Sequence, residues 1–118
     1  ASATLSQVQK YDPDNVDGVR EKAVIEYAKG ITQNAGKMSA QQRQRGFEKA
    51  RDELQKLVDQ KLSLESPQIV RYFLGILNVQ TGKKQKGIKT LKKALSIKPG
   101  SRMAQHIKKV LQHIQKRQ

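Results

Sequence analysis

The sequence predicts an all-α protein built from antiparallel helical hairpins. Apolar residues recur three and four positions apart, which is the helical period, and no window alternates with period two for long enough to indicate a strand. Pro13, Pro67 and Pro99 divide the chain into segments of helical length. Leu, Ile, Val and Phe supply 28 of the 118 residues, which is above the level of about 20% below which a highly charged chain stays disordered. We therefore expect one helical domain over residues 14–118, after a flexible N-terminal segment over residues 1–13.

Two long helices are expected first. Residues 14–36 carry an apolar stripe at helical spacing, and Gly36 is placed to end that helix. Residues 39–63 carry a second stripe that begins at Phe47, and Ser39 is placed to cap its start. These two helices would form the first hairpin.

Three shorter helices follow, which makes about five in all. Residues 67–81 predict a helix that opens with Pro67 in its first turn, is apolar around nearly its whole circumference and stops at Gly82. Residues 84–97 and 101–116 each carry a single apolar stripe. A helix that is apolar on every side must be covered on every side.

The helices repeat in pairs. Residues 24–31 match residues 69–76 at an offset of 45, the following helices match at an offset of 41, and the last helix matches the third at an offset of 34. Gly75 and Gly87 fall inside helices, where glycine costs about 1 kcal/mol relative to alanine. We expect these two glycines where the helices of one hairpin approach closely.

The unit over residues 68–101 resembles the tetratricopeptide repeat. That family has a 34-residue unit, and its characteristic spacings are filled here by Leu74, Gly75, Asn78, Gly82, Gly87, Leu91, Ala94 and Pro99. Arg71 and Asn78 stand where the family usually has Trp and Tyr, and the unit over about 23–63 is degenerate. The resemblance implies hairpins stacked as a short right-handed superhelix, with the helix over residues 101–116 as its cap.

The resemblance also implies a concave groove lined by the first helix of each hairpin, through positions 2, 5, 9 and 12 of the unit. The groove residues in this sequence would be Val24, Tyr27, Ile31, Ile69, Tyr72, Ile76 and Val79. Such a groove suits a helix or an extended peptide of another protein. The alternatives are that the chain's own N-terminal segment or extended turn covers it, or that a second copy does so in a homodimer.

One subtype of the family is not expected. Members with a carboxylate clamp, which hold the acidic tails of chaperones, have Lys, Asn and Arg at positions that Tyr27, Ile31, Phe73, Met103 and Ile107 occupy here. The sequence therefore predicts that this chain does not bind chaperone tails through such a clamp.

Positive charge is concentrated at the C-terminal end. The net charge is +14, and residues 83–118 hold twelve bases and no acid. The predicted basic surface consists of Lys83, Lys84, Lys86, Lys89, Lys93, Arg102, Lys109 and Lys116. Such a block repels itself unless its side chains spread over a helical surface or meet an anionic partner. We expect it to steer an acidic protein; the alternative is sequence-independent binding of nucleic acid or an anionic membrane surface.

No catalytic constellation is found, so the sequence predicts a non-enzyme without metal or cofactor. The chain has no Cys, which excludes thiolate zinc sites and a cysteine nucleophile. His106 and His113 lie seven residues apart among lysines, and the adjacent Asp52 and Glu53 are typical of solvated ion pairs. No apolar run reaches the length of a membrane span and no leader opens the given chain, and the compartment is left open.

Overall fold

The computed structural model describes residues 13–60 and 64–116. Over these residues the protein is all-helical, as predicted, with five α-helices, one 3₁₀ turn and no strand. The elements are α2 (Pro13–Gln33), η1 (Ala35–Lys37), α3 (Ala40–Asp59), α4 (Pro67–Gln80), α5 (Lys84–Ile97) and α6 (Arg102–Lys116). No helix within the described ranges combines the length and the apolar character that crossing a membrane requires.

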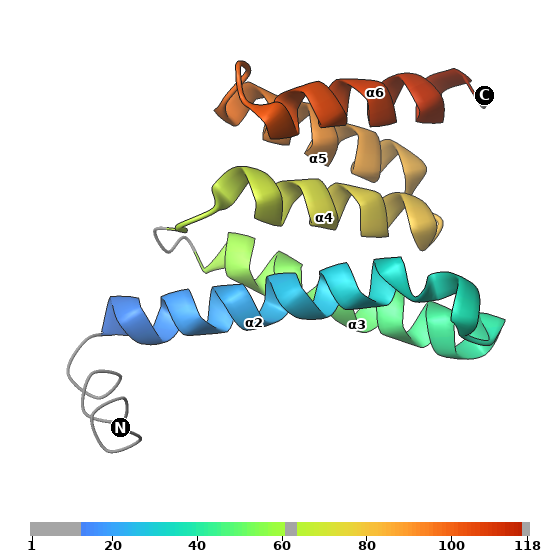
Figure 1. Ribbon diagram of the computed structural model, residues 1–118, viewed down its shortest axis with the longest axis horizontal. Coiled ribbons are helices and arrows are strands. Elements are labelled where there is room, and N and C mark those ends of the chain that lie inside the picture. The colour runs from blue at the N-terminus through green and yellow to red at the C-terminus, as the bar shows by residue number, and fades with distance from the viewer. Residues whose placement is uncertain (1–12, 61–63, 117–118) are drawn as a thin grey trace.

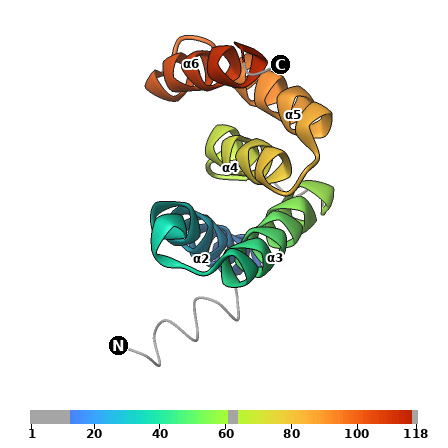
Figure 2. The same ribbon diagram turned by 90° about the vertical axis from the view of Figure 1, so that its right-hand side faces the viewer.

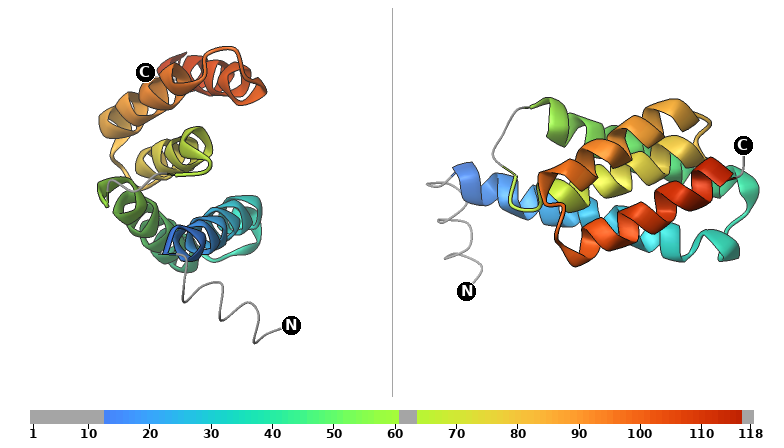
Figure 3. Two further views of the ribbon diagram at one scale, coloured as in Figure 1. Left: turned by 90° about the vertical axis from the view of Figure 1, so that its left-hand side faces the viewer. Right: turned by 90° about the horizontal axis from the view of Figure 1, so that it is seen from above.

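The helices stack as hairpins. Helices α2 and α3 form the first antiparallel pair, α4 and α5 form the second, and α6 packs on α5 (Figure 1). Seen end-on, α2, α4 and α6 lie along the concave side of a C-shaped stack, and α3 and α5 lie on its outer side (Figure 2). The same curvature is visible from the opposite end (Figure 3).

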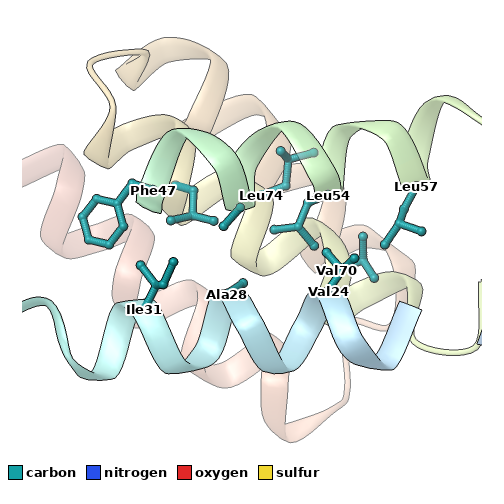
Figure 4. Close-up of a cluster of buried hydrophobic side chains, with 10 residues drawn as sticks. Val24, Ala28, Ile31, Phe47, Leu54, Leu57, Val70 and Leu74 are labelled. Carbon is teal, nitrogen blue, oxygen red and sulfur yellow. The ribbon is translucent and has the colours of Figure 1, made fainter. Parts of the chain in front are cut away.

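Two apolar clusters hold the stack together, and α4 lies between them. The first cluster joins α2, α3 and α4 and contains Val24, Ala28, Ile31, Phe47, Ala50, Leu54, Leu57, Val70, Leu74 and Leu77 (Figure 4). The second joins α5 and α6 and contains Ile88, Leu91, Ala94, Ile107, Leu111 and Ile114, with side chains of α4 packed against it. The central place of α4 explains why its sequence is apolar around most of its circumference.

Local sequence signals set several helix boundaries. The Ser39 side chain accepts a hydrogen bond from Gln42 N, and Gln42 Oε1 accepts one from Ser39 N, so a capping box starts α3. Pro67 lies in the first turn of α4, and Gly82 follows that helix with a φ of 88°. These three boundary residues are the ones that the sequence predicted.

The first two helices end earlier than predicted. Helix α2 stops at Gln33 and the chain continues as η1, and at this point both the backbone N and the side-chain Nδ2 of Asn34 donate hydrogen bonds to Gly30 O. Helix α3 ends at Asp59, and the rest of the predicted helix, residues 61–63, lies outside the described residues. The flexible segment predicted for residues 1–13 also lies outside them, except for Pro13, which is the first residue of α2.

Two buried polar side chains bind backbone groups at helix ends. The carboxylate of Glu21 on α2 accepts hydrogen bonds from Glu65 N at 3.0 Å and Ser66 N at 2.7 Å, at the start of α4. The Gln68 side chain donates to the carbonyl oxygens of Ala94 and Lys98. Backbone groups at the start of α4 and at the end of α5 are therefore satisfied by side chains from neighbouring helices.

Candidate functional site

The concave side of α4 carries partly exposed apolar residues. Val70, Leu74 and Leu77 of this helix are buried in the first cluster, whereas Tyr72 and Ile76 are half-buried and pack against the second. Ile69, also half-buried, lies beside Met103 of α6 in an open hollow. Helix α4 therefore presents Ile69, Tyr72 and Ile76 toward α6 and the concave side.

A hydrogen bond joins α4 to α6 at the middle of this surface. Tyr72 Oη lies 2.9 Å from His106 Nε2, and the two rings meet edge to face with centroids 5.3 Å apart. Burial raises the pKa of the Tyr72 hydroxyl above its ordinary value of 10.0, because the charged form would lose hydration. Tyr72 therefore stays neutral at physiological pH and is available as an amphipathic contact residue.

Helix α6 completes the surface. Met103 and Val110 lie three residues before and four residues after His106, so both share its side of the helix, and both are half-buried against the second cluster. We call the set Ile69, Tyr72, Ile76, Met103, His106 and Val110 the α4–α6 face. It combines an apolar surface with one tyrosine–histidine pair at its centre.

Two of the predicted groove residues do not line this surface. Val24 and Ile31 are each only 8% exposed, and both point from α2 toward α3 in the first cluster (Figure 4). The prediction for these two positions was wrong. A side chain buried between the helices of its own hairpin is not accessible to a partner.

The alignment of the two hairpins does not hold in the structure at this point. At the offset of 45, Gly30 corresponds to Gly75 and Ile31 to Ile76. A Cβ atom at Gly30 would have no neighbour within 4 Å, whereas one at Gly75 would lie 3.1 Å from Gly87 O and would also meet the Leu91 side chain. Ile31 lies against Gly46 of α3, so it faces the other helix of its own hairpin.

Tyr27 and Val79 also lie away from the α4–α6 face. Tyr27 is 38% exposed, and Lys49 Nζ of α3 lies 5.6 Å from the centre of its ring. Val79 is half-buried and faces the Gly87 position of α5. Of the seven predicted groove residues, the structure brings together three, which are Ile69, Tyr72 and Ile76 on α4.

The predicted basic surface is largely exposed. Lys84 is half-buried, and the remaining seven residues of the set are exposed. Lys86, Lys89 and Lys93 follow helical spacing on α5, while Gly87, Ile88, Leu91 and Ala94 are buried on the other side. In the described ranges, the ion pairs within 4.0 Å join Arg20, Arg51 and Lys56 to Glu53 and Asp52, so no carboxylate there neutralises the lysines of α5 and α6.

Part of the positive charge adjoins the α4–α6 face. Arg102 and Lys109 lie four residues before and three residues after His106, and both are exposed. This spacing places them on the same side of α6 as His106, one turn to either side. The apolar face is therefore bordered by cations along α6.

Sequence reasoning missed the contribution of α6. From the sequence, the helix over residues 101–116 is expected only as a cap with a single apolar stripe, and His106 only as one of two histidines among lysines. The alignment of α6 with α4 at an offset of 34 already paired Met103 with Ile69 and Val110 with Ile76. That alignment was the signal that could have identified them.

Comparison of the chain with models of protein families, with curated proteins and with solved structures finds no match.

Proposed function

We propose that this protein is a non-catalytic interaction module that holds an acidic segment of a partner protein against the α4–α6 face. The observation that carries the proposal is the pairing of a half-exposed apolar surface with a cationic border. Ile69, Tyr72 and Ile76 supply apolar anchoring area, and Arg102 and Lys109 border it. The resemblance to the tetratricopeptide repeat supports the same choice of surface, since it implies binding through the first helix of each hairpin.

The charge distribution favours an acidic partner. The lysines and arginines of α5 and α6 have no carboxylate of the described chain within 4.0 Å, so a partner rich in Asp and Glu would relieve their mutual repulsion. Complementary charge chiefly raises the association rate and the specificity, while the apolar contacts supply most of the affinity. An amphipathic helix with apolar anchors on one side and acids at its edges has this chemistry.

The test uses displayed random peptides of 14 residues, the length of α4. Selection should enrich peptides that combine apolar anchors with Asp or Glu. Tyr72→Ala should weaken an enriched peptide about thirtyfold, because a central aromatic anchor contributes about 2 kcal/mol. Tyr27→Ala is the matched control and should leave the affinity unchanged, because Tyr27 lies against α3 and not on the α4–α6 face.

Two results would contradict this function. Equal loss of affinity in Tyr72→Ala and Tyr27→Ala would mean that the peptide binds elsewhere. Sedimentation of the free protein as a dimer that Tyr72→Ala converts to a monomer would show that a second copy occupies the face. Circular dichroism of each variant checks that the fold is retained.

A second function is favoured by one specific observation. Lys86, Lys89 and Lys93 are exposed on one side of α5, a spacing that suits the phosphates of nucleic acid or anionic lipid. Reversing these three charges to Glu should abolish such binding, and reversing Lys22, Lys29 and Lys37 changes the net charge equally as the control. Binding to phosphates should collapse at about 0.5 M salt, whereas peptide binding at the α4–α6 face should persist.

A further inference from the structure

A hollow of about 490 Å³ lies beyond the C-terminal end of the α4–α6 face. The end of α2, the first half of α3 and the end of α4 surround it. Phe47 and Ile76 supply its apolar wall, and Thr32, Arg43, Gln44 and Gln80 supply polar groups. Ile76 belongs both to this hollow and to the α4–α6 face, so the two surfaces are continuous.

Among the described residues that line this hollow, Arg43 is the only cation, and it is half-buried there. Its Nη1 donates to Ala35 O at 3.4 Å, which leaves most of the five guanidinium donors without a carboxylate partner in the described part of the chain. Glu48 on the same helix accepts its hydrogen bond from Gln44 Nε2 at 2.9 Å. The hydrogen bond to Ala35 O places the guanidinium at the hollow, where no carboxylate of the described residues neutralises its charge.

We propose that this hollow is a carboxylate site that receives an Asp or Glu side chain of the partner protein. A planar guanidinium with free donors suits a carboxylate, which it can bind through two parallel hydrogen bonds. Ile76 lines the hollow and is half-buried, so the methylene groups of the acidic residue would contact its side chain. Assigning the carboxylate to a partner protein rests on the proposed function, whereas the site itself does not.

The site is tested with hexanoate, a carboxylate with an apolar tail, on the full ¹⁵N-labelled chain. Titration should produce saturable shifts in the backbone amide signals of Thr32, Arg43, Phe47 and Ile76. Arg43→Met should weaken hexanoate about tenfold, because hydrogen bonds to a charged group are lost. Arg45→Met removes the same charge from an exposed position on the same helix and should leave the affinity unchanged. Hexan-1-ol, which has the tail without the charge, should bind at least tenfold more weakly.

Three results would overturn the site: equal binding of hexan-1-ol, equal loss in the Arg43 and Arg45 variants, or shifts centred on residues 83–116. Arg43→Lys is a second variant that keeps the test valid if Arg43→Met disturbs the fold. It keeps the positive charge but lacks the planar guanidinium, so it should bind hexanoate more weakly than the wild type.

The assignment to a partner is tested separately with the selected peptide. Each Asp of the peptide is changed singly to Asn and each Glu to Gln. At one position this change should weaken the peptide for the wild-type protein, and Arg43→Met should then lower the affinity of the changed peptide no further. If no position behaves in this way while hexanoate binds as expected, the site stands and its assignment to the partner fails. If hexanoate does not bind but Tyr72→Ala still weakens the peptide, the proposed function stands and the site fails.

Discussion

Alanine at Gly87 should loosen the α4–α5 hairpin, and the structure indicates by how much. A Cβ atom at this position would lie 2.7 Å from Gly75 O and 2.9 Å from Val79 N, and it would also clash with Val79 Cγ2. Real Cβ contacts are essentially never below 3.0 Å, and two of the obstacles are backbone atoms that cannot rotate away. Helices α4 and α5 would have to separate by several tenths of an ångström.

The net effect of this separation is a loss of stability. Overpacking lowers the free energy of unfolding by up to about 3 kcal/mol, and the higher helix propensity of alanine raises it by about 1 kcal/mol. We therefore expect Gly87→Ala to lower the free energy of unfolding by about 2 kcal/mol. Urea unfolding followed by circular dichroism at about 222 nm measures this quantity through linear extrapolation.

Two other glycines provide a graded comparison. A Cβ atom at Gly30, inside α2, would have no neighbour within 4 Å, so Gly30→Ala should raise the free energy of unfolding by up to about 1 kcal/mol. At Gly46 the Cβ atom would approach the flexible end of Ile31, to 2.9 Å, so the effect should lie between the other two. If Gly87→Ala proves as stable as Gly30→Ala, the close approach of α4 and α5 is not as the structure describes.

The remaining predictions concern buried polar groups. Asn78 is fully buried, and neither polar atom of its side chain has a hydrogen-bond partner among the described residues. Asn78→Leu should therefore raise the free energy of unfolding by about 1–2 kcal/mol, measured in urea, and a decrease would mean that a water satisfies the amide. Glu21→Ala should lower it by about 2 kcal/mol, since Glu65 N and Ser66 N lose their acceptor, whereas Glu26→Ala on the exposed side of α2 should change it little. The raised pKa of Tyr72 stabilises the folded state below about pH 10, and this contribution is lost as the pH rises further. Absorbance titration at about 295 nm should therefore show a component that ionises above pH 10, and Tyr72→Phe should remove it.

The fold could be predicted well because its signals are local. The capping box at Ser39, the proline at the start of α4 and the left-handed glycine at 82 each act within one turn of the chain. The close approach of Gly75 and Gly87 was also predicted and is confirmed, since a glycine inside a helix has few other uses. The end of α2 at Gln33 was not predicted, because the apolar pattern of the sequence continues to Ala35, past the last helical residue.

The candidate site was predicted only in part. Ile69, Tyr72 and Ile76 lie together as expected, but Val24 and Ile31 are buried in the first hairpin. An apolar residue on a helix satisfies the periodicity whether it faces its own hairpin partner or the concave side. The periodicity alone could therefore not separate the two roles.

The sequence by itself determined the hairpins and the excess of positive charge at the C-terminal end, because helical period, glycine placement and residue counts depend on neighbours in the chain. Only the tertiary structure decided which side of α2 is buried, because the helices packed around it fix its rotation about its own axis. The hollow around Arg43 likewise depends on Thr32, Phe47 and Ile76, which three different helices bring together. A local sequence pattern cannot predict this contact between three helices. The spacing of residues within one helix shows which of them share a side, but not which other helix packs against that side.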